Sequence, residues 1–154
     1  MGITENNRYE VRAIENGTVI DHILPDALFK IIKLLDLEHD ANRITIGFNL
    51  ESGRLGKKAI IKINDRYFAQ EQINKIALFS PNVVVNIIRD FQVAQKLHVA
   101  PPATIEGFVR CINPTCITNN QSVRTRFDVV AGNGLSLRCK YCEKITLHNQ
   151  IELL

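Results

Sequence analysis

The spacing of hydrophobic residues changes several times along the first hundred positions. Where apolar and polar residues alternate, or where a short apolar run lies between polar loops, a β-strand is expected. Where apolar residues recur at i, i+3, i+4 and i+7, an amphipathic helix is expected. The sequence predicts strands at residues 9–13, 18–23, 43–49, 59–64, 83–90 and 91–97, and helices from Pro25 to Leu35 and over 69–79.

These elements follow the order β-α-β-β-α-β, with additions at both ends. Two helices on one face of a mostly antiparallel sheet make an α+β sandwich of the ferredoxin-like pattern. We therefore expect residues 1–100 to form a ferredoxin-like domain. The charged stretch at 51–58, punctuated by two glycines, is expected to be a loop.

Residues 99–107, VAPPATIEG, interrupt this pattern. Tandem prolines disfavour helix and stiffen the chain, so the domain boundary is expected here. Beyond it, the pattern predicts short strands at 123–130 and 134–139 around a turn at 132–134. Residues 101–154 are thus expected to form a small all-β domain.

All four cysteines lie in this second part, as a Cys-x4-Cys pair followed by a Cys-x2-Cys pair: Cys111, Cys116, Cys139 and Cys142. Zinc takes four tetrahedral thiolate ligands, which two close pairs can provide. A unit this short cannot build a deep core alone, and structural zinc supplies on the order of 10–16 kcal/mol of apparent binding free energy. We predict one structural zinc ion per chain. The alternatives are buried reduced cysteines or a Cys-x2-Cys redox pair, which would not need the first two cysteines.

Composition narrows the class of protein. The chain is 45% hydrophobic and 23% charged with a net charge of +3, which is ordinary for a globular protein. Neither a membrane span nor a secretion signal is evident, so a cytoplasmic chain with reduced thiols is expected. Only 6% of residues are aromatic and there is no basic stripe, so neither nucleic acid nor membrane is expected as a partner.

Several polar residues of the first domain could form a ligand site. Asp21 and His22 could be half of an acid–base pair, although the sequence identifies no third member of a triad. Lys62 interrupts an apolar strand and Lys96 lies near the end of another. Lysines on strands usually face solvent, but if these converged with His22 they would suit a phosphorylated ligand. The stretch SGRLGKK (52–58) lacks the spacing of a phosphate-binding P-loop, so a solvated basic hairpin is the simpler interpretation.

Four segments closely resemble the regulatory chain of bacterial aspartate carbamoyltransferase, and the likeness extends from about residue 8 to 150. They are GTVIDHI (17–23), RITIGFNLESGRLGKKAIIKI (43–63), ALFSPNVVVNII (77–88) and CKYCEK (139–144). The resemblance implies a non-catalytic subunit whose ferredoxin-like domain binds nucleoside triphosphates and regulates pyrimidine biosynthesis. ATP and CTP would compete for one site, and UTP would act with CTP. The zinc domain would dock on the catalytic chain, and regulatory chains would pair through their N-terminal domains. Two catalytic trimers and three regulatory dimers would form the assembly.

The resemblance also assigns individual residues. The nucleotide-contacting positions would be Ala13, Ile14, Val19, Asp21, His22, Lys62, Asn86, Ile88, Phe91, Val93 and Lys96. Lys62 matches the lysine beside the base and ribose, and Lys96 matches the lysine that binds phosphate. The four cysteines match the zinc ligands, and Glu143 matches a contact to the catalytic chain. This chain departs from the family in four places: Phe91 stands where tyrosine is common, Arg8 replaces a lysine, 129–134 lacks basic residues often found there, and the loop between the two cysteine pairs is one residue shorter than in the best-known members.

Two other classes of function remain open on the residues alone. A zinc-ribbon factor associated with nucleic acid or a polymerase would present a basic, aromatic surface. A small enzyme acting on a nucleotide through Asp21 and His22 would show turnover by the isolated chain.

Overall fold

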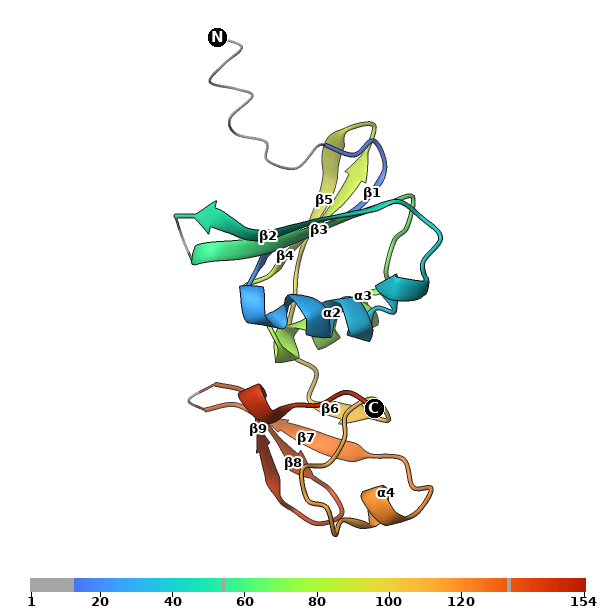
Figure 1. Ribbon diagram of the computed structural model, residues 1–154, viewed down its shortest axis with the longest axis vertical. Helices are drawn as coiled ribbons and strands as arrows, with labels where there is room; N and C mark the ends of the chain where they lie inside the picture. The colour runs from blue at the N-terminus through green and yellow to red at the C-terminus, as the bar shows by residue number, and fades with distance from the viewer. Residues whose placement is uncertain (1–12, 54, 133) are drawn as a thin grey trace. The chain divides into compact units, whose positions relative to one another are not determined.

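A computed structural model describes residues 13–53, 55–132 and 134–154 (Figure 1). The chain divides into two compact units, one extending to Val99 and the other from Ala100 to Leu154. The strand expected at 9–13 and the position of Arg8 lie outside the described residues, except for Ala13, which is in irregular backbone. In the described parts of the chain, no helix has the length and apolar character needed to cross a membrane.

The first unit is built on a five-stranded antiparallel sheet with the order β2-β3-β1-β4-β5. Its strands are β1 (Gly17–Ile23), β2 (Ile44–Ser52), β3 (Gly56–Asn64), β4 (Val84–Arg89) and β5 (Gln92–His98). The connections hold α2 (Leu28–Leu34) and α3 (Gln70–Lys75), with 3-10 turns η1 (Pro25–Ala27), η2 (Leu37–His39) and η3 (Ile76–Leu78). Figure 1 shows both helices on one side of the sheet. The first four strands have the ferredoxin-like order, so the α+β prediction is confirmed, and β5 extends one edge.

The two faces of this sheet are packed differently. Ile20, Ile61 and Val85 alternate along their strands with residues of the other face and are at most 1% exposed. Together with buried helix residues such as Leu28 and Ile73 they form the main core. On the other face Ile14, Val19, Ile60 and Ile88 form a second, smaller apolar cluster, joined by partly buried Leu50. The sheet is therefore apolar on both sides, although only one side carries helices.

The expected loop over 51–58 is wrong in its extent. β2 continues to Ser52 and β3 begins at Gly56, with Glu51 paired to Lys57 and Leu50 to Lys58. The charged residues that suggested a loop instead form the solvated end of a long hairpin, where an ion pair between Lys57 and Glu51 crosses the strands.

Phe91 is also placed differently from the prediction, which put it in a strand. Asp90 and Phe91 form a two-residue turn between β4 and β5, with φ of 52° and 65°. Two positive φ angles are typical of a type I′ hairpin turn. The turn is held by hydrogen bonds from the Asp90 N–H to Asn16 Oδ1 (3.2 Å) and from the Phe91 N–H to the Glu15 carbonyl (2.9 Å). These bonds are non-local, so strand periodicity could not indicate them.

The second unit contains a four-stranded antiparallel sheet with the order β6-β7-β8-β9. The strands are β6 (Thr104–Glu106), β7 (Arg126–Val130), β8 (Ser136–Cys139) and β9 (Ile145–Leu147), with α4 (Ile117–Asn120) and the 3-10 turn η4 (His148–Gln150). The sequence prediction overextended β7 and β8 and missed β6 and β9, because three residues are too few to show a period. Phe127 and Leu137, both 0% exposed, lie at the centre of the core.

Candidate functional site

The four cysteines of the second unit converge on one point. All four Sγ atoms lie within 4.8 Å of one another, and Sγ–Sγ distances are 3.6 Å for Cys111 to Cys142 and 3.8 Å for Cys116 to Cys139. A disulfide would require about 2.0 Å, and all four thiols are free. A tetrahedral site with metal–sulfur bonds of about 2.3 Å separates its sulfurs by about 3.8 Å. The four thiols therefore fit one tetrahedral metal ion.

The first cysteine pair is held by amide side chains of α4. Asn119 Nδ2 donates to the carbonyls of Cys111 (2.9 Å) and Asn113 (2.7 Å). Asn120 Nδ2 donates to the carbonyl of Cys116 (2.8 Å). Because these hydrogen bonds fix the backbone at both ends of the loop from Cys111 to Cys116, they also fix the positions of the two sulfur atoms.

The second pair lies in the turn between β8 and β9. The Cys139 N–H donates to the Lys144 carbonyl (3.0 Å), and the Glu143 N–H donates to the Cys139 carbonyl (2.9 Å). Glu143 has a φ of 63°, in the left-handed region. This tight turn brings the sulfur of Cys142 back toward that of Cys139, as a metal-binding turn requires.

Crowding and burial shape the acidity of these thiols. Burial raises the pKa of Cys111 and of Cys139. Burial also acts to raise the pKa of Cys142, but hydrogen bonds from the Lys144 backbone and the Asn113 side chain outweigh it and lower that pKa to about 7. A metal ion binds the thiolate form, so binding must displace protons and weakens as pH falls. Four thiolates close the coordination shell, which is the arrangement of a structural metal.

In the first unit, most of the polar residues that the resemblance assigns to nucleotide binding lie on the sheet face that carries no helices. Register pairs Lys62 with Val19, Val19 with Asn86, and Asn86 with Lys96. Residues directly opposite in antiparallel strands share a face, so these four form one row across β3, β1, β4 and β5. Ile88 pairs with Val93 on the same face.

Asp21 and His22 follow Val19 of that row along β1, at the point where this strand becomes irregular. The register between β1 and β3 shifts between Ile20 and Ile23, and His22 has a φ of 58°. The Asp21 carboxylate accepts a hydrogen bond from the His22 N–H (2.6 Å) and forms an ion pair with Lys58 Nζ (2.9 Å). Sequence reasoning missed Lys58. Its signal was the two-residue period that places it on the same face of β3 as Lys62.

Burial disfavours the charged form of ionisable side chains on this sheet face. Lys62 is only 8% exposed. Desolvation by burial lowers the pKa of Lys62; the Asp21 carboxylate opposes this shift and the Lys58 ammonium adds to it. Two further buried atoms, His22 Nδ1 and Asn86 Oδ1, have no hydrogen-bond partner among the described residues. Buried polar atoms are normally paired, so a bound water or ligand is expected here.

The remaining assigned residues lie around the apolar end of the face. Ile14 packs in the apolar cluster with Val19 and Ile88, whereas Ala13 is exposed. Phe91 is 64% exposed and Val93 is 56% exposed. The bond between Phe91 and the Glu15 carbonyl brings the turn beside the segment that carries Ala13 and Ile14.

Together the two units define a class of protein: an α+β sandwich with a candidate ligand face, covalently joined to a small cysteine-rich module with a candidate metal site. The sheet face combines apolar side chains with lysines, and the sulfur cluster has the geometry of a structural centre rather than a catalytic one.

Comparison with known proteins narrows this class. One family model, the aspartate carbamoyltransferase regulatory chain, allosteric domain, matches residues 9–100, and a second, the metal binding domain of the same chain, matches residues 103–152. The regulatory chain of Bacteroides fragilis is 46% identical over 153 residues, which cover 99% of this chain and 100% of that one. That of Porphyromonas gingivalis is 52% identical over 144 residues (94% and 95%), and that of Methanopyrus kandleri 42% over 147 residues (94% and 94%).

This chain belongs to the aspartate carbamoyltransferase regulatory chain family. The relatives are named as regulatory chains and the first matching domain is an allosteric domain, which is consistent with a non-catalytic subunit.

The cysteine cluster gives a first testable prediction. Cys139→Ser or Cys142→Ser should lose the metal and unfold the second unit while the first stays folded, because the ligands all belong to the second unit. Metal analysis should find about one ion per wild-type chain, and amide resonances in NMR spectra should collapse only for residues after Ala100. A variant that keeps both its metal and its native spectrum would refute this role.

Proposed function

We propose that this chain is the regulatory subunit that binds nucleoside triphosphates and modulates the catalytic chains of aspartate carbamoyltransferase in pyrimidine biosynthesis. The observation that carries the proposal is the row of Lys62, Val19, Asn86 and Lys96 on the open sheet face. ATP and CTP are the proposed effectors, competing for this face, with UTP acting together with CTP. Residues 1–100 are the proposed nucleotide domain and residues 101–154 the proposed docking domain.

The row has the dimensions and chemistry of an extended nucleotide. Lys62 and Lys96 are three strand spacings apart, roughly 14 Å, a span that an extended nucleoside triphosphate can bridge. Lys96, an exposed lysine on the outer strand, would meet the phosphates as a point charge. Lys62 would lie by the base and ribose. An anionic ligand nearby would stabilise its ammonium group against the burial that lowers the pKa of Lys62.

The apolar and unpaired polar groups support the same ligand. Val19, Ile14 and Ile88 form an apolar cluster on this face, against which a base would pack. His22 Nδ1 and Asn86 Oδ1 are buried, without a partner among the described residues, and available to ribose or base polar groups. Phe91 has no hydroxyl and can contribute only its ring and backbone.

We assign zinc to the sulfur cluster, because a tetrahedral set of four thiolates is the preferred structural zinc site. The metal module would dock on the catalytic chain with Glu143, exposed at the metal-binding turn, as one contact. We place the protein in the cytoplasm, where thiols remain reduced and available to the metal.

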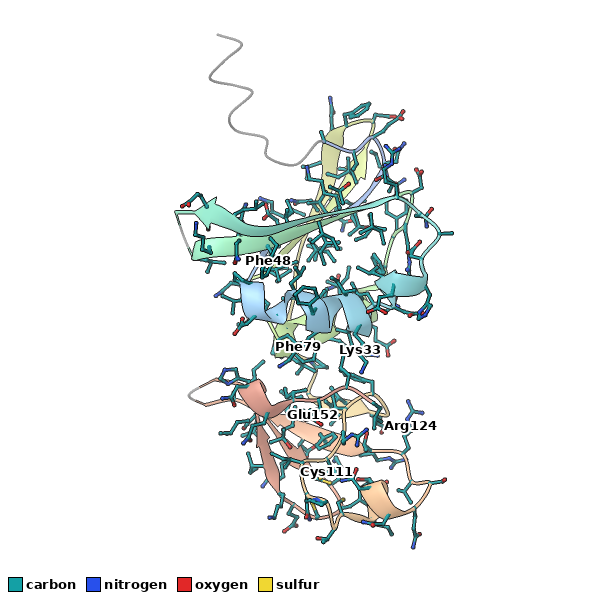
Figure 2. The ribbon with its side chains drawn as sticks, viewed as in Figure 1. Lys33, Phe48, Phe79, Cys111, Arg124 and Glu152 are labelled. Atoms are coloured by element: carbon teal, nitrogen blue, oxygen red, sulfur yellow. The ribbon has the colours of Figure 1, made fainter. Side chains whose placement is uncertain are left out.

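We further propose that two copies of this chain pair through their first units at the edge strand β2. Ile46 and Phe48 on this strand are 44% and 47% exposed, and Phe29 of α2 is 69% exposed. The rings of Phe29 and Phe48 lie 6.0 Å apart and form one apolar patch, with Phe48 on the edge strand (Figure 2). Apolar side chains gathered on an unpaired strand edge are typical of a subunit contact.

The nucleotide face can be tested with two substitutions. Lys62→Ala and Lys96→Ala should each weaken ATP and CTP binding by about 1–3 kcal/mol, because a charge-assisted contact common to both ligands is lost. Lys57→Ala is the matched control, since Lys57 pairs with Glu51 at the far end of β3 and should leave affinity unchanged. Calorimetry in which neither Lys62→Ala nor Lys96→Ala changes affinity would contradict the assignment.

Pairing of two copies can be tested at the aromatic patch. Phe48→Glu should convert the isolated chain to a monomer by placing a charge in the proposed contact. Phe91→Glu introduces the same change at an exposed aromatic residue beside β5, at the opposite edge of the sheet, and should leave the dimer intact. Sedimentation velocity of both variants distinguishes the outcomes, and a dimeric Phe48→Glu chain would place the contact elsewhere.

The assembled function is tested by reconstitution. The isolated chain should show no carbamoyl transfer, and adding it to the catalytic chains should make their aspartate saturation sensitive to CTP and ATP. Couplings between distinct sites are typically about 1–3 kcal/mol, or roughly 5- to 150-fold in affinity. Removing zinc with a mercurial should abolish the nucleotide effect but leave catalytic activity, since the metal stabilises the docking unit of this chain and the catalytic chains do not depend on it. Nucleotide sensitivity that survives metal removal would show that docking does not need the cysteine cluster.

A further inference from the structure

The short helix α4 follows Cys116 directly, and three consecutive polar side chains of this helix bond the first cysteine loop. The side-chain amides of Asn119 and Asn120 donate only to backbone carbonyls of that loop, at distances between 2.7 and 3.0 Å. These two residues therefore fix the path of the backbone. The third polar residue of the helix, Thr118, makes a contact of a different kind.

The Thr118 hydroxyl contacts one of the four sulfurs directly. Its Oγ1 lies 3.2 Å from Cys116 Sγ. A metal-bound thiolate has lost its proton, so in the metal-loaded state the hydroxyl donates and the sulfur accepts. A hydrogen bond to an ionised acceptor is roughly twice as strong as one between neutral groups. Thr118 therefore acts on the charge of the sulfur, whereas the two asparagines act on the backbone.

The charge of a four-thiolate centre gives this hydrogen bond its importance. Four thiolates around one divalent ion carry two excess negative charges, and the small second unit has only a limited core to hold them. Cys111, Cys116 and Cys139 are at most 2% exposed, so water can solvate these sulfurs very little. Buried charge is costly unless it is paired or hydrogen-bonded. Donors from the chain itself must therefore stabilise the sulfurs.

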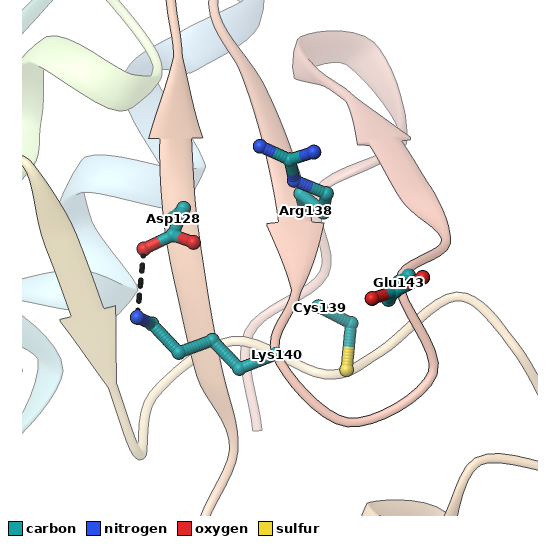
Figure 3. A pocket seen from close by; sticks show the side chains of 5 residues that line it. All are labelled: Asp128, Arg138, Cys139, Lys140 and Glu143. Carbon is teal, nitrogen blue, oxygen red and sulfur yellow. Dashed lines mark ion pairs between the residues drawn. The ribbon is translucent and has the colours of Figure 1, made fainter.

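Backbone N–H groups donate to the other three sulfurs. The second pair includes Cys139, which lies at the end of β8 (Figure 3). The donors are Asn113 to Cys111, Tyr141 and Cys142 to Cys139, and Lys144 to Cys142. Backbone donors are present whatever the side chain is. The bond described for the Cys116 sulfur comes from a side chain, so one substitution can remove it and leave the backbone unchanged.

We propose that Thr118 is a positioning residue of the metal centre, whose hydroxyl stabilises the Cys116 thiolate and thereby sets how tightly the second unit holds its metal. This inference rests on the metal assignment made under the proposed function. The metal-free unit is expected to lose its fold, so the bond forms only in the metal-loaded state and adds directly to metal affinity. Residues that bond a metal ligand typically change metal affinity by about 10- to 100-fold.

The first test compares two substitutions at this position in the full chain. Thr118→Val replaces the hydroxyl with a methyl group of similar size, which removes the donor and leaves no space for water. Competition with a metal-binding dye should show that Thr118→Val binds zinc about tenfold or more weakly than wild type, whereas Thr118→Ser, which keeps the hydroxyl, should bind nearly as wild type does. Ser122→Ala is the matched control: it removes an exposed hydroxyl two residues beyond α4 and should leave zinc affinity unchanged.

A spectroscopic measurement separates an effect on the sulfur from an effect on the fold. With cobalt(II) in place of zinc, the energy of the sulfur-to-cobalt charge-transfer absorption depends on the electron density of the thiolates. Because a lost donor raises that density, Thr118→Val should move this absorption to longer wavelength, and Thr118→Ser should restore it. A loss of affinity without this shift would show that Thr118 serves packing alone, and the inference would be wrong.

The outcomes separate this inference from the metal assignment. If the wild-type chain binds no metal, the assignment is wrong and this inference fails with it. If the wild-type chain binds one ion and Thr118→Val equals it in affinity and absorption, only this inference fails. Should Thr118→Val not fold, Thr118→Ala compared with Thr118→Ser gives the same test, because these two variants differ only in the hydroxyl.

Discussion

Side chains of an antiparallel strand alternate between two faces, and both units of this protein use only one face of their sheet for the main core. In the first unit Ile20 and Ile61 face the helices, and in the second Phe127 and Leu137 face the metal cluster. Each sheet therefore has a second face. The positions of the residues on this face are set by the strand register, but their side chains do not pack in the main core. The candidate ligand face of the first unit is one of these remaining surfaces.

The sheet face of the first unit and the cysteine cluster of the second share a second physical feature. At both sites burial disfavours the ionised form of a side chain, and a bound ligand or metal ion of opposite charge would stabilise that form. Burial lowers the pKa of Lys62 and raises the pKa of Cys111. In each case the protein disfavours the ionised form by desolvation. An anionic ligand in the first unit and a divalent cation in the second would each supply the missing counter-charge. Binding and local stability are therefore linked at both sites, most strongly in the small unit, where the core alone is limited.

Much of the architecture follows from local patterns in the chain. Period-two and period-3.6 spacing identify the strands and helices of the first unit, because half-buried elements must match their hydrophobic residues to one face. Cysteine spacing indicates the metal cluster for a similar reason, since a tight turn can present two sulfurs to one ion only when they are close in sequence. The errors of the sequence prediction were local: the hairpin at 51–58 was expected to be a loop, and Phe91 was expected to be a strand residue. Solvent-exposed strand ends, and turns held by non-local hydrogen bonds, have no periodic pattern of hydrophobic residues that would reveal them.

By itself, the sequence determined the α+β class, the four-cysteine cluster and the resemblance to a regulatory chain, all of which depend on short-range patterns and residue identity. Only the tertiary structure decided that Lys62, Val19, Asn86 and Lys96 share one row, that Lys58 pairs with Asp21, and that Arg138 stands beside Ile145. These relations depend on the register between strands that are distant in sequence. A slip of one residue would turn every one of these side chains to the other face, and the register that prevents it is set by packing of the whole sheet.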